Sequence, residues 1–281
     1  NTYNIAIGHH AGKEVTTGVQ NTILGGLAGD ALTTGSDNVA LGYAALSQED
    51  TGGRSVAIGR SALSSQNNDA SNYNVAVGYN SGVSVTTGIY NALIGGLAGD
   101  ALTTGTRNVA IGINALGTED TGSHNVAIGH HALAVADAGA DAYNVAIGSS
   151  AGAAVTTGVN NTIIGGLAGD SITTGGNNTA LGYAALSGDI AGADNVAVGF
   201  GAMSSTDNAR ANVAIGFNTL TALDYGTLTY SHNIAIGFEA GKAVTTGVEN
   251  TIIGGQAGDS LTTGGRNVAL GKSALSTEDT G

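Results

Sequence analysis

The sequence predicts an all-β fold, a parallel β-solenoid of about sixteen coils of 17 residues each, and three observations support this prediction. A pentapeptide of the type Asn-Val-Ala-Ile-Gly recurs along the whole chain. Gly accounts for 48 of the 281 residues, and helices would be interrupted repeatedly at a cost of ~1 kcal/mol per Gly. Hydrophobic residues make up 42 % of the chain and supply the burial that a disordered low-complexity chain lacks.

The pentapeptide occurs sixteen times, as a single repeat array over residues 1–281. It begins at residues 4, 21, 38, 55, 74, 91, 108, 125, 144, 161, 178, 195, 212, 233, 250 and 267. The interval is 17 residues, apart from two intervals of 19 and one of 21. Because the starts at 4, 74 and 144 are 70 residues apart, four repeats form a set, whose members we call first to fourth. The chain begins at the end of one repeat and ends inside another, so we expect it to be a piece of a longer fibre.

Positions 1 to 5 of the repeat predict a short strand that ends in a turn. Position 2 is usually β-branched, position 4 is always aliphatic and position 5 is always Gly. Position 1 is Asn in fifteen of the sixteen repeats, with Ser55 as the exception, and amides stacked in register would form a hydrogen-bonded ladder between coils. The predicted structural ladder consists of Asn4, Asn21, Asn38, Asn74, Asn91, Asn108, Asn125, Asn144, Asn161, Asn178, Asn195, Asn212, Asn233, Asn250 and Asn267.

The remainder of the repeat predicts one apolar plug per coil. First and second repeats have an aliphatic residue at position 12, such as Leu32, whereas third and fourth repeats have a large side chain at position 9, such as Leu46. In second repeats the middle strand residue is Ile or Leu in place of Ala, and Gly-Gly follows. For Ile23 we expect Gly26 to offset the added volume, as in a close-packed interior.

Both faces of the predicted strand are apolar, because the middle residue points to one face and positions 2 and 4 to the other. A lone solenoid has one interior, so the second face needs a partner. Either copies of the chain or another molecule would cover it. We favour three copies around an axis, with small side chains such as Ala76, Ala110 and Ala127 allowing close approach.

Charge and repetition argue against several functions. Lys and Arg number 8 against 21 Asp and Glu, a net charge of −13, so no basic stripe is present for nucleic acid. No apolar run reaches the ~18 residues of a membrane helix, so no membrane insertion is expected. A repeat supplies the same residue many times, whereas catalysis needs different residues to converge, and we predict no enzyme, no cofactor and no metal site. The paired carboxylates Glu49-Asp50, Glu119-Asp120 and Glu278-Asp279 are interpreted as solvated turns.

Three insertions are the predicted places for recognition. They span residues 64–73, 134–143 and 221–232 and precede the Asn of a first repeat, which places them on one edge of the solenoid. Extra residues leave the stack and are free to vary, and Tyr suits a partly hydrated contact surface. The candidate contacts to a receptor or a neighbouring subunit are Asn72, Tyr73, Asp141, Tyr143, Tyr225, Tyr230 and His232. The alternative is a tolerated surface insertion whose Tyr packs on a neighbouring subunit.

The Asn-Val-Ala-Val-Gly unit of residues 74–78 resembles the head repeats of trimeric autotransporter adhesins. Residues 156–165, Thr-Thr-Gly-Val-Asn-Asn-Thr-Ile-Ile-Gly, are more similar to repeats of phage tail-fibre-type proteins. The resemblance covers the whole chain, and Val or Thr after the Asn, where autotransporter heads usually carry Ser, favours the fibre type.

This resemblance implies a trimeric, left-handed β-roll that acts in host attachment. The expected partners are two further copies of the chain, adjoining fibre segments at both ends, and a cell-surface receptor or glycan. The expected location is extracellular, on a virion tail fibre or a bacterial cell surface. The alternatives are the head or stalk of a bacterial trimeric surface adhesin, or another extracellular structural filament.

Overall fold

The computed structural model of the protein describes residues 2–277, 279 and 280. The chain divides into two compact units, residues 1–143 and 144–281, and each is described by itself. Every coil contributes one three-residue strand followed by turns, and none of the described residues is helical. The described part of the chain accordingly holds no apolar helix of membrane-spanning length.

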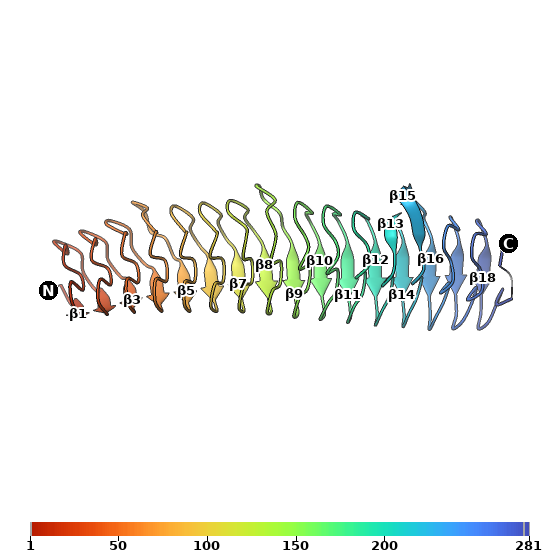
Figure 1. The fold of residues 1–281 in the computed structure, drawn as a ribbon, viewed down its shortest axis with the longest axis horizontal. Helices are drawn as coiled ribbons and strands as arrows, with labels where there is room; N and C mark the ends of the chain where they lie inside the picture. The colour runs from red at the N-terminus through yellow and green to blue at the C-terminus, as the bar shows by residue number, and fades with distance from the viewer. Residues whose placement is uncertain (1, 278, 281) are drawn as a thin grey trace. The chain divides into compact units, whose positions relative to one another are not determined.

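In residues 1–143, one strand from each coil joins a parallel sheet (Figure 1). Each residue pairs with its equivalent in the next repeat, as Val39 does with Val56. Within this unit the strands are β1 (Ile5–Ile7), β2 (Thr22–Leu24), β3 (Val39–Leu41), β4 (Val56–Ile58), β5 (Val75–Val77), β6 (Ala92–Ile94), β7 (Val109–Ile111) and β8 (Val126–Ile128).

Residues 144–281 repeat this arrangement and add a small second sheet. The solenoid strands are β9 (Val145–Ile147), β10 (Thr162–Ile164), β11 (Thr179–Leu181), β12 (Val196–Val198), β14 (Val213–Ile215), β16 (Ile234–Ile236), β17 (Thr251–Ile253) and β18 (Val268–Leu270). The third insertion contains β15 (Asp224–Tyr230), which pairs in parallel with β13 (Asp207–Arg210). The prediction of an all-β parallel solenoid with about sixteen coils is confirmed.

The interior of each coil lies on the side of the middle strand residue. Ala76, Ala110 and Ala127 are 0 % exposed within the single chain. The expectation that these Ala side chains allow close approach between copies is therefore wrong, because they already pack inside their own solenoid. The apolar residues at positions 2 and 4 form the outer face of the sheet and are half-buried or exposed.

The Gly at position 5 has the role expected of a corner residue, whereas the second Gly of the Gly-Gly pairs has a different role from the one expected. At position 5, Gly25 has φ +139°, and a Cβ there would lie 2.4 Å from the carbonyl oxygen of Gly42 in the next coil. Gly26 does not compensate for Ile23, since its open side faces the Tyr43 ring. The compensating residue is Gly12 at position 9 of the preceding coil, where a Cβ would lie 2.8 Å from Ile23 Cδ1.

Candidate functional site

The Asn side chains at position 1 connect each coil to the next through the backbone. The Nδ2 group of Asn21 donates to the carbonyl oxygen of Gly35 in its own coil at 2.8 Å. The Oδ1 atom of Asn21 accepts the backbone N–H of Asn38 in the next coil at 3.0 Å. The same two bonds recur in other coils, and each is expected to contribute ~1 kcal/mol net. The column is mainly a ladder of amide-to-backbone bonds, with occasional amide-to-amide contacts such as Asn161 with Asn144.

Gln66 occupies the interior of the coil that has Ser55 in place of the ladder Asn. Its Nε2 group donates to Ser55 Oγ at 2.8 Å, and its Oε1 atom accepts from Nδ2 of Asn74 at 2.8 Å. Gln66 is fully buried, so its amide replaces the missing one. The sequence signal for this exchange was present, because a Gln stands at position 12 of the same repeat that lacks Asn at position 1.

Glu49 lies in the interior of the solenoid, so its predicted place at a solvated turn is wrong. Its Oε1 atom accepts the backbone N–H groups of Gly52 at 2.8 Å and Asn68 at 3.4 Å. Its Oε2 atom accepts from Nε2 of Gln66 and Nδ2 of Asn72, each at 2.9 Å. Burial raises the pKa of Glu49, and the hydrogen bonds from Gln66 and the backbone act in the opposite direction. Position 12 points inward whether it carries Leu or an acid, which is why the paired-carboxylate interpretation failed.

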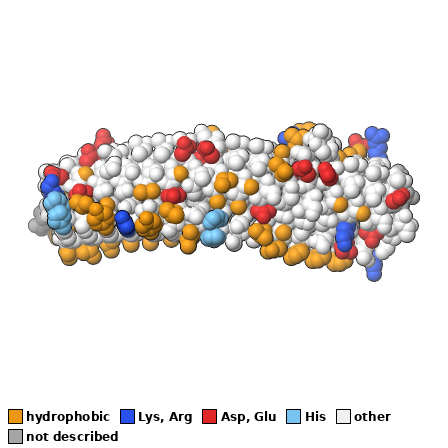
Figure 2. Space-filling model, viewed as in Figure 1, with side chains coloured by type: hydrophobic (Ala, Val, Ile, Leu, Met, Phe, Trp, Pro, Cys, Tyr) orange, Lys and Arg blue, Asp and Glu red, His pale blue; other side chains and the backbone are white. Residues whose placement is uncertain are grey.

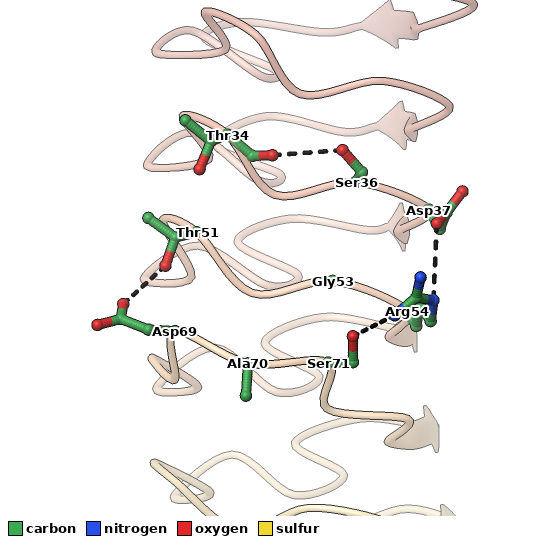
Figure 3. A pocket seen from close by; sticks show the side chains of 9 residues that line it. All are labelled: Thr34, Ser36, Asp37, Thr51, Gly53, Arg54, Asp69, Ala70 and Ser71. Carbon is green, nitrogen blue, oxygen red and sulfur yellow. Dashed lines mark hydrogen bonds and ion pairs between the residues drawn. The ribbon is translucent and has the colours of Figure 1, made fainter.

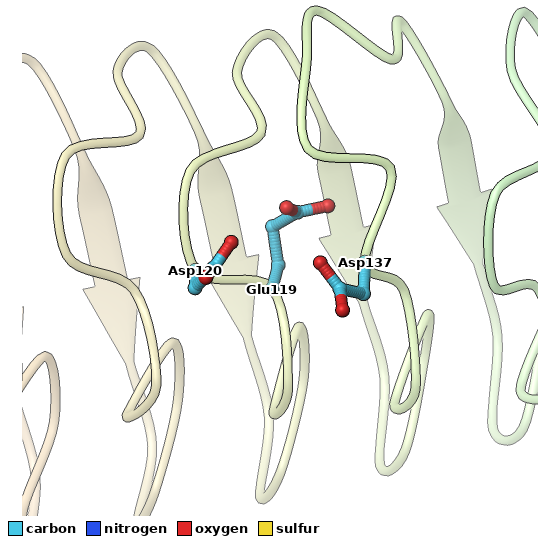
Figure 4. A group of neighbouring side chains, drawn as sticks. All are labelled: Glu119, Asp120 and Asp137. Atoms are coloured by element: carbon cyan, nitrogen blue, oxygen red, sulfur yellow. The ribbon is translucent and has the colours of Figure 1, made fainter.

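Glu119 is the equivalent buried acid of the second set, and its prediction as a solvated residue is likewise wrong. Its Oε1 atom accepts the backbone N–H of Gly122 at 2.7 Å, and its Oε2 atom accepts that of Ala138 at 3.4 Å. Carboxylate oxygens of Glu119, Asp120 and Asp137 lie within 4.8 Å of one another (Figure 4). Burial raises the pKa of Glu119, and the two Asp charges act in the same direction. Both oxygens of Glu119 already accept backbone N–H groups, those of Gly122 and Ala138, and we assign no ion to this group.

Asp189 is the buried acid of the third set. It is fully buried, and its Oδ1 atom accepts the backbone N–H of Gly192 at 2.8 Å. Burial is the main cause that raises the pKa of Asp189 to about 6, and the negative charge of Asp207 acts in the same direction. The turns around Glu49, Glu119 and Asp189 are called the buried-acid turns below.

The second residues of the predicted carboxylate pairs lie nearer the surface. Asp120 is exposed and Asp50 is half-buried, and their backbone carbonyl oxygens accept from Thr103 and Thr33. Glu278 of the third predicted pair lies outside the described residues.

The first insertion places its two candidate contacts on opposite sides of the chain. Asn72 is buried and donates to Glu49, so its side chain does not reach the surface as a receptor contact would. Tyr73 is exposed, and its ring stacks on that of Tyr90 with 5.5 Å between the centroids. Arg54 lies over the Tyr73 ring, 5.6 Å from the centroid.

In the second insertion Tyr143 is exposed, and its ring stacks on that of His124 with 4.8 Å between the centroids. Asp141 lies 3.3 Å from Nδ1 of His124. These three side chains form one contiguous surface group.

In the third insertion, one predicted contact residue is bonded within the chain and another is exposed. Tyr225 is half-buried, and its hydroxyl donates to the carbonyl oxygen of Gly247 at 2.7 Å and accepts from Nδ2 of Asn233. Because its hydroxyl is bonded within its own chain, Tyr225 acts as a structural group, and burial raises the pKa of its phenol. Tyr230 is exposed, with its ring centroid 6.0 Å from that of His232.

A polar hollow of about 250 Å³ opens beside the first insertion (Figure 3). One wall holds Thr51, whose hydroxyl donates to Asp69 Oδ1 at 2.6 Å. The opposite wall holds Arg54, whose Nε lies 3.8 Å from Asp37 Oδ2 and whose Nη1 donates to the Ser71 hydroxyl. The complete lining is Thr34, Ser36, Asp37, Thr51, Gly53, Arg54, Asp69, Ala70 and Ser71.

Exposed aromatic rings form a second surface feature, in residues 144–281. Tyr183, Phe200, Phe217 and Phe238 stack in sequence with 5.2 to 5.4 Å between neighbouring centroids. We call these four residues the aromatic column. They occupy position 6, directly after the strand and its Gly, and each is 42 to 52 % exposed. Figure 2 shows that hydrophobic side chains gather on the surface of each unit, where Lys and Arg are few.

Comparison with known proteins found no matching family, no matching curated protein and no matching solved structure.

Proposed function

We propose that the chain is a structural and adhesive fibre segment, assembled as a homotrimer of the phage tail-fibre type and acting in host attachment outside the cell. The observation that carries the proposal is the outer face of the sheet. Its aliphatic residues at positions 2 and 4 stay partly exposed in coil after coil, as Leu24, Ile94, Leu181 and Ile215 do. Covering such a face is favourable by about 25 cal/mol for each Å² of apolar surface.

Copies of the same chain are the partner that best fits this face. The face repeats in every coil and is almost free of charge, so only another long repeating apolar face covers it throughout. The interior needs no such partner, because the chain's own Ala, Leu and Val side chains fill it. The aromatic column adds four rings beside the outer face and enlarges the apolar surface offered to a neighbour.

We propose no catalytic activity for the buried-acid turns. Their carboxylates are fully buried and accept hydrogen bonds from the turn's own N–H groups, as Glu49 does from Gly52. This is the arrangement of a structural group that satisfies a buried backbone.

Assembly is tested by the mass of the purified chain in solution. At micromolar concentration, sedimentation equilibrium should give three times the 27.2 kDa of one chain. Leu181→Asp places a charge on the outer face and should lower the mass to that of one chain. Ser205→Asp adds the same charge at an exposed position 11 and should leave the trimer intact. A parent chain that sediments as a soluble single chain contradicts the trimer.

Attachment is tested separately, with the fluorescently labelled parent chain and a panel of intact bacteria. We expect saturable binding to at least one surface, and competition by an excess of unlabelled chain. A trimer that shows no saturable binding to any surface on the panel would be a purely structural filament, and the adhesive part of the proposal would fail.

A further inference from the structure

The hollow beside the first insertion lies over small residues at position 16 of three consecutive coils. Ser36, Gly53 and Ala70 occupy this position, where the neighbouring first repeats carry the larger Val19 and Ile89. The second set also has small residues there, Ser123 and Ala140, so the polar side chains around this floor are what distinguish the hollow. The Gly53 position cannot take a larger side chain, since a Cβ there would lie 2.5 Å from the carbonyl oxygen of Ser36. The floor is therefore open, and Figure 3 shows the polar side chains standing on either side of Gly53 and Ala70.

The walls of this hollow offer donors and acceptors in close alternation. Asp37 and Asp69 present carboxylate oxygens, Arg54 presents a guanidinium, and Thr51 and Ser71 present hydroxyls. The contacts of Arg54 with Asp37 and with Ser71, and its position over the Tyr73 ring, hold the guanidinium in place. Hydroxyl groups of a ligand can both donate to the carboxylates and accept from the guanidinium.

The equivalent place beside the second insertion lacks this set of groups. Gly139 stands where the first insertion has Asp69, and His124 stands where Arg54 is. Asp69 is supplied by the insertion itself, so the extra residues of the first insertion build one wall of the hollow.

Size and charge then select the class of ligand. A volume of about 250 Å³ is below the range of roughly 300 to 1,000 Å³ found for pockets that hold drug-sized molecules, which suits a single sugar ring. The lining holds two carboxylates against one guanidinium, and the chain carries a net charge of −13, so an anionic ligand would be repelled.

We propose that this hollow binds one neutral monosaccharide unit of a surface glycan, with Asp69 and Arg54 as the principal hydrogen-bonding residues. The inference rests on the proposed function, since attachment is the reason for a fibre to hold a sugar. Each site binds weakly, because one ring makes few contacts, and the copies in a trimer would add avidity.

The test uses the parent chain and neutral methyl glycosides of glucose, galactose, mannose and N-acetylglucosamine, with sialic acid and glucuronic acid as anionic probes. Saturation-transfer NMR should detect binding of at least one neutral glycoside, with a millimolar dissociation constant, and none of the anionic sugars. Asp69→Ala, at an exposed position, should weaken that binding at least tenfold, and Arg54→Ala should do the same.

Arg107→Ala is the matched control, because Arg107 also lies over a Tyr ring, that of Tyr90, but does not line the hollow. It should leave sugar binding unchanged. The inference is overturned if no neutral glycoside binds, if an anionic sugar binds better, or if binding survives Asp69→Ala in the folded variant. Cell attachment without sugar binding would reject this inference alone, whereas sugar binding without cell attachment would reject the proposed function.

Discussion

The buried-acid turns around Glu49 and Glu119 carry the same residue at the same position of the repeat, but surround it differently. At Glu49 two side-chain amides, from Gln66 and Asn72, donate to the carboxylate. The equivalent residues near Glu119 are Ala136 and Ala142, both buried, and neither has a side-chain donor.

The difference shows that two kinds of donor can stabilise a buried acid in this solenoid, namely backbone N–H groups of the turn and side-chain amides. Both turns keep the backbone bond three residues on, from Gly52 to Glu49 and from Gly122 to Glu119. Of these two turns, the Glu49 turn alone adds side-chain donors from Gln66 and Asn72, which offset part of the cost of burying a charge. A buried acid at position 12 can therefore be retained with only the backbone donors of its turn, as at Glu119. The side-chain amides at Glu49 are additional donors.

The largest expected effect comes from converting the Glu49 turn into the arrangement around Glu119. Gln66→Ala combined with Asn72→Ala removes both side-chain donors from a buried carboxylate. Breaking a buried charged network of this kind costs about 3–5 kcal/mol at neutral pH, which chemical denaturation of the double variant would measure.

A third change separates lost charge compensation from lost packing. Adding Glu49→Gln to the double variant removes the uncompensated charge and should recover part of the lost stability. No recovery would mean that packing alone determines the effect, and the two turns would then not differ electrostatically.

The sequence was sufficient for the solenoid and insufficient for these turns. Gly at position 5 and the strand pattern predict the strand positions correctly, because each coil repeats the same short-range signals. The sequence predicts solvated acids because charged residues are rarely fully buried, and no residue near Glu49 indicates that position 12 points inward there as it does at Leu32. The sequence does not predict the hollow either, since Asp69 and Arg54 belong to different coils and line the same hollow only because the coils stack.

The next effect extends the comparison to Asp189, whose pKa is raised from 3.8 to about 6. A raised pKa means that the folded state holds its proton to a higher pH than the unfolded state. The contribution of Asp189 to stability is therefore fully present below about pH 4 and is lost as the pH rises from about 4 to 6. Asp189→Asn removes this penalty and should stabilise the chain by roughly 3 kcal/mol at pH 7, with little effect at pH 4.

Thermal or urea unfolding of the parent and of Asp189→Asn at pH 4, 5, 6 and 7 would measure the difference between the two curves. A variant that is equally stable to the parent at pH 7 would show that Asp189 ionises inside the solenoid without penalty. The buried acids would then be better compensated than their hydrogen bonds indicate.

The smallest expected effect concerns why the Asn ladder is interrupted at Ser55. Ser55→Asn restores the residue found in the other fifteen repeats, yet it should destabilise the chain, because Gln66 already fills that space. Overpacking of this kind costs typically 1–3 kcal/mol.

Adding Gln66→Ala reproduces the pair Asn125 and Ala136 of the second set and makes room for the new amide. Because Gln66→Ala also removes a donor from Glu49, the double variant should recover only part of the lost stability. The coupling energy between the two changes, measured in a double-mutant cycle, therefore decides the question. A cycle in which the two changes are additive would show that Ser55 and Gln66 are independent, and that the interruption of the ladder has another cause.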